Sequence, residues 1–246
     1  MTDPRPQIPH VLMSIEIQFL SVAGPLAFSK YHILMEILFQ IAILIFSVII
    51  HEVSHGYAAL MLGDQTAKRL GRLTLNPIPH IDPIGSIVVP ALLIFSGSSF
   101  LIGWAKPVPY NSYNLRNQRW GDAIVSAAGP LANLFMALLF GLVIRSFPLF
   151  PLGELPDAFM FVIAYIVVIN IVLAIFNLLP IPPLDGSKVF FSFLPYQYRR
   201  LGMEIEARYG MLPLILILVF FSTALSFIIL PIMGFLFTLF SGQRLF

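Results

Sequence analysis

Two histidines and a glutamate lie close together in the sequence, inside a run of apolar residues. The segment 49–57 reads I-I-H-E-V-S-H-G-Y, so His51 and His55 are four residues apart. In an α-helix, residues i and i+4 share a face, as two ligands of one metal ion must. Glu52 lies about 100° around the helix, where its carboxylate can reach a metal-bound water without binding the metal itself. The pattern predicts a catalytic zinc site.

The apolar surroundings favour a functional interpretation of these polar residues. A charged side chain at the centre of a membrane helix costs about 2.5–3.5 kcal/mol on insertion scales, and ionisable groups in membrane segments mark functional sites. A chance occurrence of the pattern would carry that cost without any compensation. We therefore interpret His51, Glu52 and His55 as metal-binding or catalytic residues.

The composition predicts an integral membrane protein. Of the 246 residues, 58% are hydrophobic and 11% are charged, with a mean hydropathy of +0.90. A soluble domain has about 25% charged residues. The lysines and arginines lie between apolar blocks and form no long run, which fits membrane topology better than nucleic-acid binding. The absence of cysteine excludes disulfides, thiolate metal ligands and a cysteine nucleophile.

Four apolar segments are long enough to span a bilayer, which takes about 20 residues; they are 31–62, 122–145, 157–179 and 211–240. The last is expected to be kinked or broken at Pro231. The stretches 65–77 and 103–110 read as short strands, and the prolines of the second suit a sheet edge. The predicted fold is an all-α polytopic membrane protein with about four spanning helices, a re-entrant segment at 84–102 and a small membrane-associated β element.

A catalytic zinc site needs a third protein ligand and one open position for water. Asp185 is a candidate because it follows the 157–179 span in the stretch N-L-L-P-I-P-P-L-D-G, where three prolines free the backbone from helical hydrogen bonding and Gly186 allows a sharp turn. The same aspartate could instead be the N-cap of a helix over 186–194. The spacing alone leaves both interpretations open.

The combination of these motifs resembles a known family. H-E-x-x-H in a membrane span, followed after a later span by N-x-x-P-x-x-x-L-D-G, is similar to the site-2 protease family of intramembrane zinc metalloproteases. The sequence G-P-L-A-N at 129–133 is similar to the G-x-x-x-N element of that family. The resemblance covers about 31–194. This chain lacks an inserted PDZ domain and an appended nucleotide-binding module, so it looks like a compact, prokaryotic, core-only member.

The resemblance implies a ligand set and a reaction. One Zn²⁺ per chain would be bound by His51, His55 and Asp185, Glu52 would be the general base, and Asn177 would lie near the bound substrate as a second catalytic group. The reaction would be hydrolysis of peptide bonds in or near transmembrane segments of a substrate protein within the lipid bilayer. The identity of the substrate and the oligomeric state do not follow from the sequence.

The resemblance also suggests three parts of the chain. Residues 1–30 would form an N-terminal tail and interfacial segment. Residues 31–195 would form the catalytic membrane core, and residues 196–246 a C-terminal membrane segment.

A shared metal ion constrains the membrane topology. If His51, His55 and Asp185 bind one ion, the spans 31–62 and 157–179 must run in the same direction, with 122–145 as the one crossing between them. The apolar segment 84–102 must then dip into the membrane and return.

The distribution of charge gives that topology an orientation. The connections 63–83, 103–121 and 180–210 would share a face, whereas the connection 146–156 would lie opposite and contains no lysine or arginine. The basic residues of the shared face are Lys68, Arg69, Arg72, Lys106, Arg116, Arg119, Lys188, Arg199, Arg200 and Arg208. By the positive-inside rule the metal site lies toward the cytosolic side of a cell membrane.

Other residues have competing interpretations. Lys106–Tyr110 could present an edge to which an unwound substrate adds as a strand, with Val108 and Tyr110 on it. His80 and Asp82 more often stabilise a turn than form a second metal site. The rival functions are a membrane protease of the prenyl-protein type, with Glu204 or Glu206 as third ligand, and a non-proteolytic metal-binding or transport protein. Glu52 and the L-D-G motif favour the site-2 protease interpretation over both.

Overall fold

The computed structural model describes residues 30–95, 104–147 and 157–245. Its longer helices are α2 (Lys30–Met61), α5 (Gly121–Ser146), α6 (Asp157–Asn177), α8 (Tyr196–Tyr209) and α9 (Leu212–Ser241). Shorter helical elements are α3 (Thr66–Arg69), η1 (Ile78–His80), η2 (Pro83–Val88), α4 (Val89–Phe95), η3 (Ser112–Asn114) and α7 (Asp185–Phe193). Four of these helices, α2, α5, α6 and α9, are long and apolar enough to cross a membrane, as the sequence predicted. The predicted tail and interfacial segment at 1–30 lies almost entirely outside the described residues.

Helix α2 carries the H-E-x-x-H motif on its C-terminal turns. Its earlier turns expose large apolar side chains, among them Leu38, Phe39 and Phe46, which suits contact with lipid. The helix ends at Met61 and is followed two residues later by Gly63, whose φ of 110° lies in the left-handed region that glycine adopts without steric cost. The motif therefore lies near the end of the span, within reach of water.

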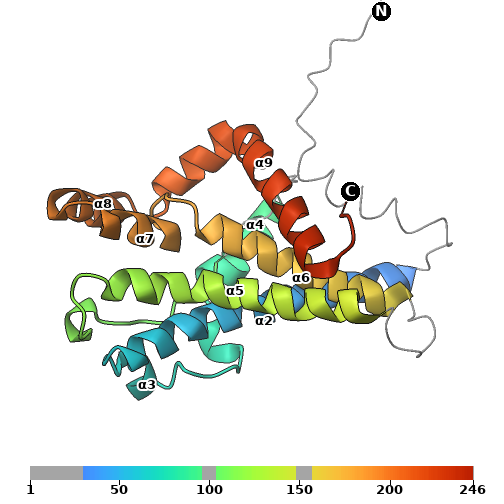
Figure 1. Ribbon diagram of the computed structural model, residues 1–246, viewed down its shortest axis with the longest axis horizontal. Coiled ribbons are helices and arrows are strands. Elements are labelled where there is room, and N and C mark those ends of the chain that lie inside the picture. The colour runs from blue at the N-terminus through green and yellow to red at the C-terminus, as the bar shows by residue number, and fades with distance from the viewer. Residues whose placement is uncertain (1–29, 96–103, 148–156, 246) are drawn as a thin grey trace, which may run out of the picture.

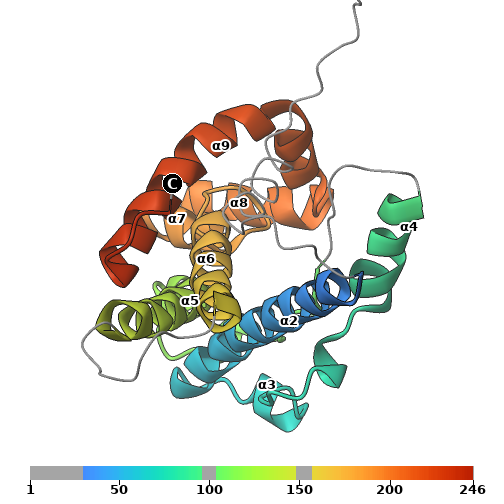
Figure 2. The same cartoon turned by 90° about the vertical axis from the view of Figure 1, so that its right-hand side faces the viewer.

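Helices α2, α5 and α6 pack side by side, and the second half of α9 covers α5 and α6 (Figure 1, Figure 2). The colours of Figure 1 show that α2 and α6 run in the same direction and that α5 runs against them, which is the arrangement predicted from a shared metal ion. One buried core joins α5, α6 and α9; it consists of Ala137, Ile144, Ile163, Val167, Val168, Ile171, Met233 and Phe237.

The interruption of the last apolar block was predicted at the wrong residue. Pro231 lies inside the continuous part of α9, whereas the backbone leaves helical geometry at Phe221, with φ −124° and ψ 16°. A proline in a membrane helix is tolerated because neighbouring groups can satisfy the carbonyl that it leaves unpaired. Figure 1 shows the resulting bend between the first half of α9 and its second half, which contains the candidate span Ala224–Ser241.

The predicted β element is also wrong. Within 30–95, 104–147 and 157–245 the backbone forms no strand. Part of 65–77 is instead helix α3, whose first residue, Thr66, donates from its backbone N–H and its hydroxyl to the carboxylate of Asp64 at 3.2 and 2.6 Å. Residues 104–110 are extended, but their backbone groups bond to side chains and loops and not to a strand.

The segment predicted to be re-entrant begins with η2 and α4, and residues 96–103 lie outside the described residues. Asp82 caps η2 by accepting from the N–H groups of Ile84 and Gly85 at 3.0 and 2.7 Å, and His80 Nε2 bonds to the carbonyl of Thr74 at 2.9 Å. These contacts match the turn-stabilising interpretation of His80 and Asp82. The helices of 83–95 do not support a dip and return, so the re-entrant geometry stays a prediction.

Candidate metal centre

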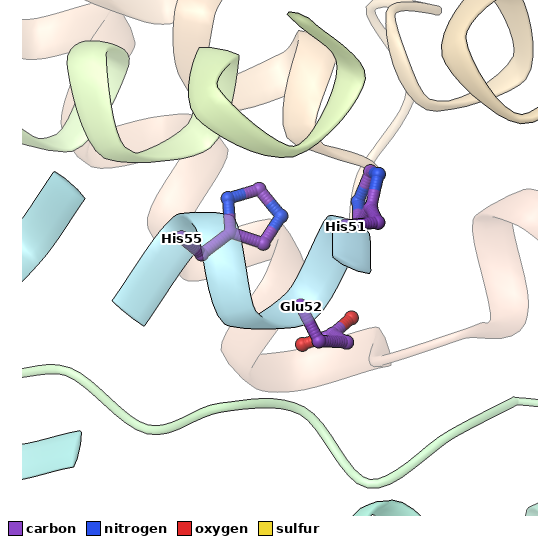
Figure 3. A group of neighbouring side chains, drawn as sticks. All are labelled: His51, Glu52 and His55. Carbon is purple, nitrogen blue, oxygen red and sulfur yellow. The ribbon is translucent and has the colours of Figure 1, made fainter. Parts of the chain in front are cut away.

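His51 and His55 lie one turn apart on the face of α2 that packs against α5. Both are buried, with 5% and 8% of their surface exposed. Their rings meet edge to face with centroids 4.7 Å apart. Figure 3 shows both imidazoles on the same side of α2, below the ribbon of α5, and Glu52 on the other side.

Asp185 meets these histidines from α7. Its Oδ2 lies 3.0 Å from His51 Nε2 and 3.2 Å from His55 Nε2. Asp185 is the first residue of the helix and Leu184 is its N-cap, so the alternative in which Asp185 caps the helix is wrong.

A tight turn brings Asp185 to the histidines. A Cβ on Gly186 would collide with the carbonyls of Leu178 and Leu179, at the end of the α6 span. Only glycine leaves room for the chain to fold back this closely after the span. In the D-G pair of the sequence motif, Asp185 is therefore the candidate metal ligand, and Gly186 is the glycine that allows Asp185 to reach the histidines.

The three converging atoms fit a zinc ion. Zinc bonds to nitrogen and oxygen are about 2.0–2.2 Å long, so neighbouring ligand atoms of a tetrahedral site lie about 3.3 Å apart. The observed separations of 3.0 and 3.2 Å agree with that spacing. Two imidazole nitrogens and one carboxylate oxygen are a donor set that zinc prefers, and they leave a fourth position for water.

The far nitrogen of each imidazole already has a partner. His51 Nδ1 bonds to Asn133 Oδ1 at 2.6 Å, and His55 Nδ1 bonds to the backbone carbonyl of Val125 at 2.7 Å. Since a carbonyl oxygen only accepts, each Nδ1 carries the proton and each Nε2 turns a lone pair toward the other ligands. Such outer contacts orient the histidines of zinc sites.

Gly129 of α5 leaves room for the two imidazoles. A Cβ built on it would lie 2.5 Å from His55 Nε2 and 2.6 Å from His51 Nε2. Asn133 follows one turn later on the same helix and holds His51. The G-x-x-x-N element thus combines one residue that leaves room with one that supplies a hydrogen bond.

Glu52 points away from the two imidazoles in Figure 3 and faces the extended segment 104–110. Its Oε2 accepts a hydrogen bond from the backbone N–H of Val108 at 2.9 Å. A carboxylate oxygen of Glu52 and one ring nitrogen from each histidine all lie within 4.8 Å of one another. The carboxylate of Glu52 is therefore close to the two imidazoles. Glu52 is half-buried, whereas the histidines are buried.

The extended segment 104–110 is held by two groups from the connection after α2, the side chain of Arg72 and the backbone carbonyl of His80. Arg72 Nη2 donates to the carbonyls of Lys106 and Pro107 at 2.9 and 3.3 Å. The N–H of Lys106 donates to the carbonyl of His80 at 2.9 Å. Val108 is buried, with 5% exposed, while Lys106 and Pro107 are exposed.

Asn177, the second predicted catalytic residue, ends α6 and donates from Nδ2 to the carbonyl of Leu173 at 2.9 Å. Nothing in that bond joins it to the metal ligands, so its role stays a prediction. Sequence reasoning missed Asn170 and Ser47, which contact Asn133. Their signal was available, because a buried asparagine in the apolar run V-V-I-N-I-V needs a partner in a membrane helix.

Comparisons with known proteins agree with this geometry. The model of Peptidase family M50 matches residues 153–221, the range that holds α6, Asp185 and α7. The protein named "Putative zinc metalloprotease YwhC" of Bacillus subtilis is 37% identical over 195 residues, which are 78% of this chain and 84% of that protein. The chain belongs to peptidase family M50, the site-2 protease family.

A more distant relative of this M50 peptidase is "Putative zinc metalloprotease Rip2" of Mycolicibacterium smegmatis, which is 34% identical over 140 residues. The match covers 57% of this chain and 51% of Rip2, so the chain spans about half of that protein's length. No solved structure matches the chain. As an M50 member with four candidate spans among its described residues, the protein is an integral membrane metalloprotease whose metal is zinc.

Proposed function

We propose that this protein is an intramembrane protease that hydrolyses peptide bonds in or near the transmembrane segments of other membrane proteins. His51, His55 and Asp185 are its zinc ligands and Glu52 is its general base. The observation that carries the proposal is the approach of Asp185 Oδ2 to the Nε2 atoms of both histidines, at 3.0 and 3.2 Å. Asp185 lies 134 residues after His51 and 130 residues after His55 in the chain.

Glu52 has the position that a general base needs. When bound, zinc supplies a water of lowered pKa, about 7, and a Lewis acid for the scissile carbonyl. One carboxylate oxygen of Glu52 is held by the N–H of Val108, which leaves the other free to accept the proton of the attacking water and to pass it to the leaving amine. Asn177 is proposed as a donor to the oxyanion that forms on the carbonyl.

The extended segment 104–110 lines the approach to Glu52. A helical substrate must unwind before a peptide bond can reach the site, because its own hydrogen bonds shield that bond. The N–H groups of Lys106 and Val108 are already bonded to His80 and Glu52, and residues 107 and 109 are prolines without an N–H. An unwound substrate strand would therefore donate its own N–H groups to carbonyls of this segment.

The metal centre is proposed to face the cytosol. The connections that follow α2, precede α5 and follow α6 lie at one end of the bundle in Figure 1, and this is the end rich in lysine and arginine. Positive loops remain on the cytosolic side during membrane insertion. The relatives are bacterial, so the setting is a bacterial cell membrane, with a transmembrane protein as substrate and the lipid bilayer as surroundings.

The test compares Asp185→Ala with Glu206→Gln in purified, detergent-solubilised protein. Zinc per chain and cleavage of a transmembrane peptide are measured for each. We expect one zinc per wild-type chain, loss of both zinc and cleavage in Asp185→Ala, and retention of both in Glu206→Gln, since Glu206 pairs with Lys188 at 3.6 Å. Full zinc and activity in Asp185→Ala would overturn the ligand set, and losses in Glu206→Gln would favour the prenyl-protein type of site.

A further inference from the structure

A chain of three buried polar side chains connects α2, α5 and α6 beside His51. We call Ser47, Asn133 and Asn170 the amide chain; 4%, 0% and 1% of their surface is exposed. Asn170 Nδ2 donates to the hydroxyl of Ser47 at 3.0 Å and to the carbonyl of Ile166 at 2.8 Å. The amide chain lies in the hydrophobic part of the bundle, where water cannot replace a missing partner.

Asn133 connects the amide chain to the metal centre. Its Nδ2 donates to Asn170 Oδ1 at 2.8 Å and to the carbonyl of Ser47 at 3.2 Å. Its Oδ1 faces His51 Nδ1 at 2.6 Å. Asn170 itself does not contact the histidine, so any effect of Asn170 on the metal centre passes through Asn133.

The direction of every hydrogen bond in the amide chain is fixed by backbone carbonyls, which only accept. The carbonyl of Ile166 requires the NH₂ group of Asn170 on its side, which turns Asn170 Oδ1 toward Asn133. That oxygen and the carbonyl of Ser47 together require the NH₂ group of Asn133. Asn133 must then present its oxygen to His51, and an oxygen there requires a proton on Nδ1.

We infer that Asn170 is a positioning residue that sets the tautomer of His51 through the amide orientation of Asn133. The inference rests on the proposed function in one respect, that His51 Nε2 is a zinc ligand. With Nδ1 protonated, Nε2 has a free lone pair for the metal.

A reversed amide would have the opposite effect. If the side-chain amide of Asn133 turned over, its oxygen would face the carbonyl of Ser47 and its NH₂ group would face His51 Nδ1. Nδ1 would then have to accept, and the imidazole proton would move to Nε2, the atom that must bind zinc. Asn170 and the carbonyl of Ser47 both oppose this reversal. Removing Asn170 therefore weakens the preference of Asn133 for the orientation with its oxygen toward His51, but does not abolish that preference.

The expected effects on zinc affinity are therefore graded. Asn133→Leu should weaken zinc binding about 10- to 100-fold, the usual range for the loss of an outer partner of a histidine ligand. Asn170→Leu should weaken it about fivefold, the equivalent of one hydrogen bond. In the double variant, adding Asn170→Leu to Asn133→Leu should not lower zinc affinity further, because Asn133, through which Asn170 acts on His51, has already been removed.

The test is this double-mutant cycle in the full-length protein in detergent, with zinc affinity measured by competition with a chelator. Asn133→Leu combined with Asn170→Leu replaces both partners of a buried hydrogen bond by apolar side chains of similar size, which preserves folding better than either single change. Ser241→Ala is the control. It removes a buried hydroxyl on α9, which donates to the carbonyl of Phe237 and also contacts the backbone of Gln243, and should leave zinc affinity unchanged.

A second readout separates positioning from general stability. In the cobalt-substituted protein, each ligating imidazole has one N–H proton with a metal-shifted NMR signal. Asn170→Leu should make the His51 signal exchange faster with solvent and leave that of His55 unchanged, because His55 is held by the carbonyl of Val125.

Three outcomes are distinguished. Zinc retained by His51→Ala would overturn the proposed function itself. Zinc lost in His51→Ala, with wild-type affinity and wild-type exchange in Asn170→Leu, would overturn only the inference about Asn170. Equal zinc losses from Asn170→Leu in the wild-type and Asn133→Leu backgrounds would also overturn it, since Asn170 would then act independently of Asn133.

Discussion

The two sides of α2 at the metal centre are built differently. The side of His51 and His55 faces spanning helix α5 and the start of α7, is buried, and has a partner for each ring nitrogen. The side of Glu52 faces the irregular segment 104–110, which is exposed at Lys106 and Pro107. The two histidines are therefore held by packed helices, whereas the carboxylate of Glu52 is held by a partly exposed segment.

The chemistry of the supporting groups differs in the same way. On the histidine side they are neutral amides and carbonyls, which a membrane interior tolerates when they are paired. Near Glu52 the supporting group is the backbone N–H of Val108, and the segment that carries it is held by a charged side chain, Arg72, bound to the carbonyls of Lys106 and Pro107. Changes on one side should affect metal binding, and changes on the other should affect turnover.

The largest expected effect comes from Glu52→Gln. Glutamine can still accept from the N–H of Val108 but cannot take a proton from water, so kcat should fall about 10²- to 10⁴-fold, the contribution of general acid–base catalysis. Zinc content should remain that of the wild type. Peptide cleavage and metal analysis on the same preparation measure both, with Glu206→Gln as the matched change on α8. Loss of zinc in Glu52→Gln would show that the two sides of α2 are not separate, and cleavage at the wild-type rate would show that Glu52 is not the general base.

The next largest effect is expected from Gly129→Ala on the histidine side. The new Cβ would lie 2.5–2.6 Å from the two Nε2 atoms, so the rings must move and zinc affinity should fall by about tenfold or more. Gly141→Ala is the matched control on the same helix. Its Cβ would meet Phe240 of α9 at 2.6 Å, far from the metal, so it should lower Tm without changing zinc affinity. Equal zinc affinity in the two variants would refute the role of Gly129.

The sequence was most informative where an ionisable or metal-binding residue lies in or next to an apolar segment. His51, Glu52 and Asp185 were found in this way, and the need for one shared ion correctly ordered the directions of α2, α5 and α6. A polar group in a membrane segment is costly and must have a reason, so such residues stand out in the sequence. The roles of these three residues at a metal ion stay predictions. Whether the three parts 1–30, 31–195 and 196–246 act as units stays a prediction.

Local patterns misled where tertiary contacts decide. The alternation in 65–77 resembles a strand, but Thr66–Arg69 form helix α3, and Asp64 just before it accepts hydrogen bonds from Asn111 and Asn114, far along the chain. Pro231 is the stronger helix breaker in sequence, yet the bend of α9 is at Phe221, because the second half of α9 is fixed by packing on α5 and α6. Asn170 was overlooked because its role depends on Asn133, on a different helix.

A smaller effect is expected from Arg72→Gln, which acts on the Glu52 side. Loss of the charged donor frees the carbonyls of Lys106 and Pro107, and the N–H of Val108 no longer holds Glu52 as firmly. Cleavage should fall about three- to tenfold, corresponding to a weakened hydrogen bond of about 1 kcal/mol, with zinc affinity unchanged. Arg69→Gln is the control, since Arg69 is exposed and contacts only Gln65 at 3.5 Å among the described residues. A reduced zinc affinity in Arg72→Gln would contradict the separation of the two sides.

The smallest effect on cleavage is expected from Asp64→Asn, in the turn that joins α2 to the loop before α5. Asp64 is 1% exposed and accepts from Thr66, the N–H of Asn111 and the side chain of Asn114. Burial favours its neutral form, but the hydrogen bonds from Asn114 and Thr66 outweigh burial and hold the pKa below 3.8 in the folded protein.

The sign of the pH dependence follows from that lowered pKa. Ionised Asp64 stabilises the fold fully above the unfolded value of 3.8, and this stabilisation is lost as the pH falls through the lower folded pKa. Asp64→Asn should therefore unfold more easily at pH 7, by about 1–3 kcal/mol, and should lose less stability on acidification than the wild type. Thermal unfolding in detergent at pH 7 and pH 3 measures both. A larger loss on acidification in the variant would reverse the assignment, and a fall in zinc affinity at pH 7 would mean that this turn also positions the histidines.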